Sequence, residues 1–201
     1  MSTAEMAGDE RAVRGTSSPV LGMVLFVASE AMFFAAFFAI YAMSYSSQPS
    51  WPPKGVTVPS IGVPSVMTGL IVASSFFLQL GVRAIRRGDG RRLSLWLATT
   101  LLLGATFVAM QLFGYSQIEF GIRSGIYASL FYVMTGVALA HVVGGVVFLL
   151  LVLVRSATGH LTMVRHEPAE AAAIYWHFVV IVSVALYVVF YLLVSVQPKG
   201  P

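Results

Sequence analysis

Three ionisable side chains lie inside long apolar stretches of the sequence: Glu30, His141 and His177. A carboxylate in the middle of a bilayer is costly, so Glu30 is neutral, paired with another group, or part of a proton or ligand site. Glu30 is also the only acidic residue that we place deep inside a membrane span. The chemistry that these three residues could carry is therefore proton exchange or ligand binding within a membrane.

The depths of these residues decide which of them can meet. The predicted span limits place Glu30 and His141 near the middle of the membrane, so a hydrogen bond between them would relieve the cost of burying both. A core histidine bonded to a hydroxyl or a backbone carbonyl is the simpler expectation. His177 falls two turns into the last span, near the cytoplasmic interface, beside Trp176, which suits the headgroup level.

The same residues do not form a redox or metal centre. A haem held by two histidines needs them at matching depth on facing helices, and His141 and His177 differ in depth. An oxygen-activating metal needs three or more convergent ligands. The chain has no cysteine, which excludes thiolate ligands and disulfides. We expect no cofactor and no catalytic machinery in this chain, which makes it a subunit that supports a catalytic partner.

The composition predicts an integral membrane protein. Of the 201 residues 58% are hydrophobic and 10% are charged, whereas a soluble domain carries about 25% charged residues. Residues 1–18 are polar and predict a mobile N-terminal tail, and residues 19–197 predict one transmembrane domain. Spans need about 20 apolar residues. The sequence predicts an all-α bundle of five spans, at about 20–45, 63–86, 93–115, 125–154 and 169–196.

The basic residues predict the orientation of the bundle. Nine of the twelve Lys and Arg residues fall on the side that holds the N-terminus. Because positive charge stays inside, we expect a cytoplasmic N-terminus and an external C-terminus. This topology explains the net charge of +4, so no nucleic-acid partner is needed.

Small residues recur every four positions in the first and fourth spans. Such stripes let helix backbones approach closely in lipid, so we expect them at helix contacts. The residues are Ala31, Ala35 and Ala39 in the first span, and Gly136, Ala140 and Gly144 in the fourth.

Several motifs occur in an order that resembles a known family. They are LFVASEAMFFAAFFAIY from Leu25, Trp51-Pro52-Pro53, ASSFFLQLGVRAIRRGD from Ala73, the segment Gln111–Tyr115, SLFYVMTGVALAHVVGG from Ser129, and YWHFV from Tyr175. Together they resemble subunit III of the haem–copper terminal oxidases, over Leu21 to about Tyr191. The five-helix form is similar to bacterial members that lack two extra N-terminal helices.

Four positions depart from the pattern of this family. Gly114 stands where a glutamate is usual, Ala138 replaces a histidine, Val180 an aspartate and Ser183 a tryptophan. These changes reduce any polar network around Glu30. They also leave open a divergent relative, such as the subunit III-like protein associated with nitric oxide reductase.

The resemblance implies specific partners and roles. Subunit III carries no haem or copper, packs against subunit I beside subunit II, binds phospholipid and sustains proton uptake; haem and copper belong to the partner subunits. Its carbodiimide-reactive buried glutamate is matched by Glu30, with His141 as a polar partner. Trp176, His177 and Arg83 are candidate lipid-binding residues.

We therefore expect a non-catalytic subunit III of an aerobic respiratory cytochrome c oxidase in a bacterial inner membrane, within a proton-pumping complex that could join a larger respiratory assembly. The first alternative is an accessory protein of nitric oxide reductase or of a quinol oxidase. The second is a small proton-coupled transporter with Glu30 as carrier, although five spans without a repeat argue against it.

Overall fold

The computed structural model describes residues 17–53, 60–162, 164 and 166–196. These residues form α2 (Ser18–Ser47), α3 (Gly62–Arg86), α4 (Gly90–Ser116), α5 (Ile126–Ala157), α6 (Glu167–Tyr187), the π-helical turn η1 (Val188–Leu192) and α7 (Leu193–Val196). Within the described residues, five helices are long and apolar enough to cross a membrane, the last being Glu167–Val196. The predicted all-α class with five spans is confirmed.

Each predicted span lies inside its helix or misses it by one residue. The predicted tail of residues 1–18 falls outside the described residues, except for Ser17 and Ser18. Five of the basic residues that predict the orientation also lie outside the described residues. The orientation of the bundle therefore stays a prediction. These five are Arg11, Arg14, Lys54, Arg165 and Lys199.

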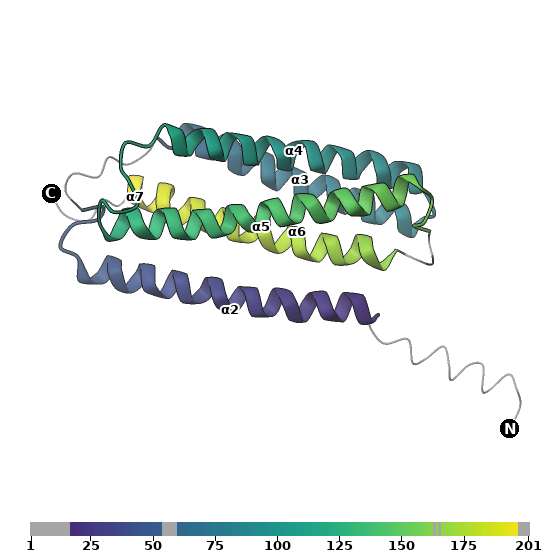
Figure 1. The fold of residues 1–201 in the computed structure, drawn as a ribbon, viewed down its shortest axis with the longest axis horizontal. Coiled ribbons are helices and arrows are strands. Elements are labelled where there is room, and N and C mark those ends of the chain that lie inside the picture. Colours follow the sequence, from purple (N-terminus) through teal and green to yellow (C-terminus); the bar gives the residue numbers. More distant parts are fainter. Residues whose placement is uncertain (1–16, 54–59, 163, 165, 197–201) are drawn as a thin grey trace, which may run out of the picture.

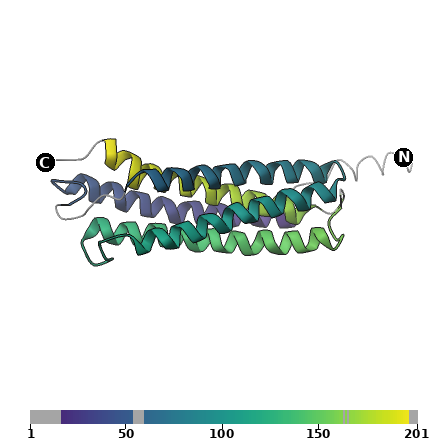
Figure 2. The same ribbon diagram turned by 90° about the horizontal axis from the view of Figure 1, so that it is seen from above.

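The helices lie nearly along one axis in three layers (Figure 1). α3 and α4 form one side, α5 and α6 form the middle, and α2 lies on the opposite side, where it packs on α6 and to a smaller extent on α5. Figure 2 shows the same long bundle from above. We call the end with connections 48–61 and 117–125 the Trp51 end, and the end with connections 87–89 and 158–166 the Arg86 end.

At the Arg86 end, the N-termini of α4 and α6 carry residues that stabilise the free backbone N–H groups of the first helical turn. The Asp89 side chain caps α4 by accepting from the Arg92 backbone N–H at 2.9 Å. α6 begins with Glu167 and Pro168, and its first turn carries the negative charge that a helix dipole favours. Two cationic or titratable side chains, Arg86 and His166, both approach Oε1 of Glu170, at 2.7 and 3.1 Å. This cluster ties the end of α3 to the start of α6.

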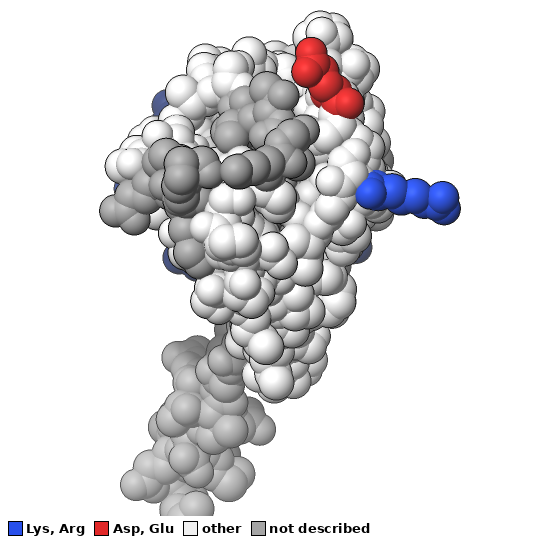
Figure 3. Space-filling model, turned by 90° about the vertical axis from the view of Figure 1, so that its left-hand side faces the viewer, with Lys and Arg blue, Asp and Glu red and all other residues white. Residues whose placement is uncertain are grey.

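The two ends differ in charge. The described charged residues in the connections of the Trp51 end are Glu119 and Arg123. Figure 3 views this end, where one acidic and one basic side chain project prominently from the described part of the surface. The Arg86 end carries most of the described arginines: Arg83, Arg86, Arg87, Arg91, Arg92 and Arg155.

Close helix packing depends on glycines other than those in the predicted stripes. A Cβ atom at Gly104 would lie 2.7 Å from the Trp176 ring, and one at Gly145 would lie 2.8 Å from it. A Cβ atom at Gly136 would meet nothing within 4 Å. The small residues of the α2 stripe, Ala31, Ala35 and Ala39, are exposed. The stripe prediction is therefore wrong for contacts within this chain, because α2 meets the middle layer through larger side chains such as Phe34.

An aromatic cluster closes the Trp51 end around η1. The Trp51 indole, which is fully buried, donates to the Tyr41 hydroxyl at 2.9 Å. Tyr41 in turn donates to the Val189 carbonyl, and Tyr127 of α5 donates to the Phe190 carbonyl. Both carbonyls belong to η1, where π-helical bonding disturbs the regular ladder. Hydroxyls from α2 and α5 therefore bond carbonyls in the one irregular turn of the last span.

Candidate functional site

Glu30 and His141 meet where α2 crosses the middle of α5. The Oε2 atom of Glu30 lies 3.0 Å from the Nε2 atom of His141, and their side chains are 22% and 18% exposed in the isolated chain. Both residues lie near the centre of their helices, far from either end of the bundle. The structure thus brings together the two residues that the sequence places at matching depth.

The second ring nitrogen of His141 determines how protons are distributed over the pair. Nδ1 lies 2.8 Å from the carbonyl of Val137, one helical turn earlier. A carbonyl only accepts hydrogen bonds, so Nδ1 must carry a proton and donate it. Nε2 and Oε2 then share one proton, either on the acid or on the imidazole. Both forms leave the pair without net charge, as a site within an apolar bundle requires.

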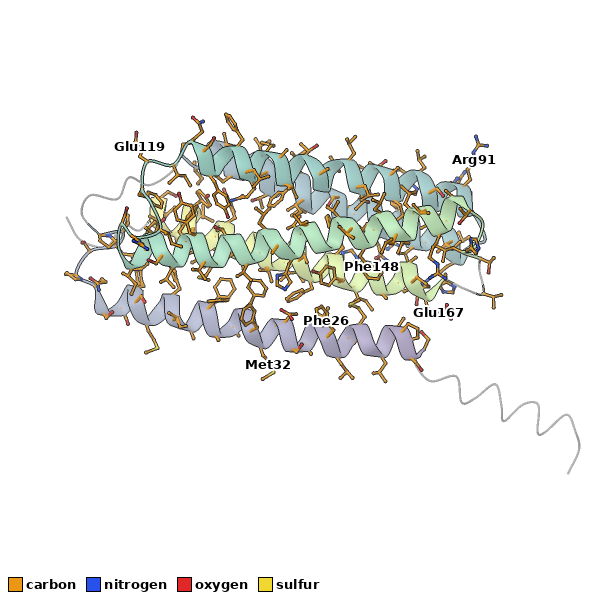
Figure 4. The ribbon with its side chains drawn as sticks, viewed as in Figure 1. Phe26, Met32, Arg91, Glu119, Phe148 and Glu167 are labelled. Carbon is orange, nitrogen blue, oxygen red and sulfur yellow. The ribbon has the colours of Figure 1, made fainter. Side chains whose placement is uncertain are left out.

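Aromatic rings from α2 and α6 surround this pair. The Phe34 ring packs edge-on against the His141 ring, with 5.2 Å between ring centroids. Tyr175 of α6 donates to the backbone carbonyl of His141 at 3.0 Å, and its ring stacks on Phe26 of α2 at 6.1 Å. Figure 4 shows Phe26 on the side of α2 that faces α5 and α6, whereas Met32 points away from the bundle. Three helices therefore hold one carboxyl–imidazole bond.

The other intramembrane histidine, His177 of α6, has a separate set of partners on α3. Its Nδ1 atom is hydrogen-bonded to the Ser75 hydroxyl, and its Nε2 atom lies 3.1 Å from the Gln79 side-chain oxygen. Because that oxygen only accepts, Nε2 of His177 carries the proton and Nδ1 accepts from Ser75. His177 does not approach Glu30 or His141.

The three candidate lipid-binding residues differ in exposure. Trp176 is fully buried, and its indole N–H donates to the Ser74 hydroxyl at 2.9 Å. His177 is half-buried, and Arg83 is exposed near the Arg86 end. Lipid binding at these residues stays a prediction, for which Arg83 alone offers an open side chain.

Sequence reasoning missed the partners of Trp176 and His177. Two adjacent hydroxyls of α3, Ser74 and Ser75, bond two adjacent side chains of α6. The signal was present as a pair of serines inside an apolar helix, because such hydroxyls are used for bonds between helices. The contribution of η1 was also missed, since a π-turn leaves no mark on hydropathy.

The four departures from the family pattern fall in two kinds of place. Ala138 and Ser183 line a cavity between α3, α4, α5 and α6, and Gly114 lines a second hollow nearer the Trp51 end. Val180 is buried in close packing on α6. Three of the four therefore border open space.

The chain also resembles characterised proteins. A family model described as cytochrome c oxidase subunit III matches residues 4–195. The protein named cytochrome c oxidase subunit 3 of Synechocystis sp. is 37% identical over 87% of this chain and 75% of its own length. That of Thermostichus vulcanus is 35% identical over 87% of both chains, and that of Cyprinus carpio is 39% identical over 85% of this chain and 67% of its own.

These matches cover nearly the whole bundle, including both helices that meet at Glu30 and His141. They agree with the five long apolar helices, which make the chain a multi-pass membrane protein. The chain belongs to the cytochrome c oxidase subunit III family and is a subunit of a haem–copper oxidase complex.

Proposed function

We propose that this chain is the accessory subunit III of a terminal oxidase in a bacterial inner membrane, where it contacts subunits I and II and stabilises subunit I. Haem and copper reside in those partner chains, which reduce oxygen and pump protons. The observation that carries this proposal is the outer face of α2, which no helix covers among the described residues.

The exposed side of α2 is large and apolar. Only Phe34, Tyr41 and Ser44 of this helix are buried. Met32, Met43 and Leu25 are 76%, 71% and 64% exposed. Lipid tails solvate such side chains as well as protein does, but small residues on the same helix allow another backbone to approach closely. Ala31, Ala35 and Ala39 provide that surface for a partner helix.

The histidines support placing the redox centres in partner chains. His141 bonds Glu30 and Val137, and His177 bonds Ser75 and Gln79. Each ring thus has both nitrogens engaged within this chain, whereas a haem iron takes an imidazole nitrogen as its ligand.

Phospholipid is the second partner in this proposal. Arg83 is exposed near the Arg86 end, beside Arg86 and Arg87. Anionic headgroups attract such basic residues by about 1 kcal/mol each. The positive-inside rule then places the Arg86 end in the cytoplasm, which lets the subunit support proton uptake by subunit I from that side.

Purification through an affinity tag on this chain tests the proposal. We expect the preparation to contain haem and copper subunits and to consume oxygen with reduced cytochrome c. Oxidation of quinol only, or reduction of nitric oxide only, would reassign the chain to one of the alternatives. A preparation without haem would contradict the proposal.

A further inference from the structure

The bundle contains a small cavity, lined by both apolar and polar side chains, that the oxidase family assignment does not use. It has a volume of about 50 Å³ and lies between α3, α4, α5 and the last span. Six of its lining residues carry hydroxyl or amide groups: Thr68, Gln111, Thr135, Ser183, Tyr187 and Tyr191. Of the described residues that line it, none is charged. The buried side-chain N and O atoms of the described residues already have hydrogen-bond partners within the chain, so a molecule in the cavity would make additional bonds to them.

The cavity continues towards the Trp51 end. A second hollow of about 200 Å³ is lined by Ser60, Gly114 and Gln117 among others. The two hollows share Pro64, Met67, Gln111 and Tyr191. They therefore adjoin one another and lead from the first turns of α3 towards the middle of the bundle, where Ser183 and Val142 lie.

At its deep end the cavity meets an apolar wall. Ala138 lines the cavity and also a tight space that holds Phe34, His141, Phe178 and Val182. This tight space has no volume for a water molecule. The wall separates the cavity from the bond between His141 and Glu30.

The hydroxyls in the cavity can accept further hydrogen bonds. Thr68 donates to the Pro64 carbonyl at 2.8 Å, and Ser183 donates to the Val179 carbonyl at 2.9 Å. Each hydroxyl has thereby used its proton on its own helix and keeps a lone pair for a donor from the cavity. The Gln111 amide offers N–H donors as well. A water molecule usually makes two to four such bonds, and about 30 Å³ is its share of liquid volume.

We propose that the cavity between Thr68, Gln111 and Ser183 binds a small group of water molecules that is continuous with water at the Trp51 end and stops at the apolar wall beside His141. The site takes one or two ordered waters at its deep end, given its volume of about 50 Å³. The structure thus gives one end of the bundle an aqueous path to mid-membrane depth and keeps the carboxyl–imidazole pair dry.

Silver-ion accessibility tests this proposal in the purified assembly reconstituted in nanodiscs. The chain contains no cysteine, so a single introduced thiol can be followed by mass spectrometry of this chain alone. Ag⁺ is small, cannot enter hydrocarbon, and binds a thiolate where water reaches it. The readout is loss of later labelling by N-ethylmaleimide after denaturation.

Three variants lie along the proposed path. We expect Gln117→Cys, exposed at the Trp51 end, to be blocked fastest, followed by Thr68→Cys and then Ser183→Cys. Two neighbours of Ser183 are matched controls. Val182→Cys lies in the apolar wall, and Ile181→Cys points outwards with 67% exposure, so both should keep full labelling.

Adding Ala138→Leu to Ser183→Cys should restore labelling, because the larger side chain fills the deep end of the cavity. The absorption spectrum of the assembly and its retention of this chain verify that each variant is folded. Full labelling of Ser183→Cys under conditions that block Gln117→Cys would overturn the proposal. Equal blocking of all the thiols would overturn it too, because entry would then not depend on the cavity.

Discussion

The half of the bundle around Trp176 and the half towards the Trp51 end differ in how their helices meet. Around Trp176, two glycines let α4 and α5 close on an indole, and a Cβ atom at either would lie under 3 Å from the ring. Towards the Trp51 end, Ala138 and Ser183 line a cavity of about 50 Å³ that the side chains around it leave unfilled. Both halves have small residues, but among the described glycines only the two beside Trp176 would place a Cβ atom under 3 Å from a neighbouring atom.

This difference shows what sets packing density in lipid. Lipid tails are as apolar as leucine, so no hydrophobic effect pulls helices together and complementary shapes must do so. A glycine opposite a tryptophan fits, whereas an alanine opposite a serine leaves space. That space is retained where polar groups line it, since water can fill a polar cavity and an apolar one stays empty.

The largest effect should come from enlarging a glycine in the close-packed half. Gly145→Ala places a methyl group 2.8 Å from the buried Trp176 ring. We expect the free energy of unfolding to fall by about 1–3 kcal/mol, measured by denaturant titration of the solubilised chain. Gly136→Ala in the same helix is the control, because nothing lies within 4 Å of its Cβ position. Equal losses for the two variants would remove the basis of the comparison.

A loss of similar size should follow from removing the hydrogen bond of the Trp176 indole. Ser74→Ala removes its only acceptor among the described residues and leaves a buried N–H without a partner. The expected loss is about 1–3 kcal/mol in the same titration. Ser29→Ala is the matched control, since its exposed hydroxyl bonds only a carbonyl of its own helix. A Ser74→Ala variant as stable as the parent would show that the indole N–H finds another partner.

In the open half a comparable enlargement should cost little. Ser183→Val adds volume that the cavity can accommodate, so we expect the free energy of unfolding to stay within about 0.5 kcal/mol of the parent. A loss as large as that of Gly145→Ala would mean that the two halves are equally filled.

The Glu30–His141 pair lies between the two halves. The carboxyl group of Glu30 should react with a membrane-soluble carbodiimide. Its shared proton allows the acid form of Glu30, which is the form that a carbodiimide activates. Labelling should be lost in Glu30→Gln, as checked by mass spectrometry. Equal labelling of Glu30→Gln would show that another carboxyl group is the target.

The smallest effect should be on the initial rate of oxygen reduction. Glu30→Ala leaves the aromatic packing of Phe34 and Tyr175 in place and removes no redox group. We expect the initial rate of the assembled complex to be largely unchanged, as measured with an oxygen electrode. Immediate and complete loss of activity would show that Glu30 takes part in catalysis itself.

Hydropathy and depth predicted the features that depend on chain length and position. The five spans follow from runs of about 20 apolar residues, and the shared depth of Glu30 and His141 follows from the span limits. The hydrogen bond between them also requires that α2 and α5 lie side by side at that depth. Hydropathy is compatible with this arrangement but does not determine which helices are neighbours.

The features that could not be predicted depend on which side of each helix faces inwards. In α5 and α6 apolar residues lie all round the helix, so periodicity does not mark the buried face. The four-residue spacing therefore predicts contacts at Gly136 and Gly144, whereas the neighbouring Gly145 makes the close contact. Burial of Trp176 was missed for the same reason, since a tryptophan near a predicted interface equally fits a membrane headgroup region.

The π-turn η1 has a consequence for how the last span is aligned. Each π-type bond encloses one residue more than an α-type bond, so the helix after Leu192 is rotated by about 100° from the phase set by α6. Heptad or 3.6-residue patterns counted from Trp176 do not extend to Val194. Deleting one residue within Val188–Leu192 would restore an unbroken α-helix and leave the segment beyond it on the same side, because the π-turn accommodates one extra residue. Sequence gaps between relatives in the last span are therefore expected at this turn.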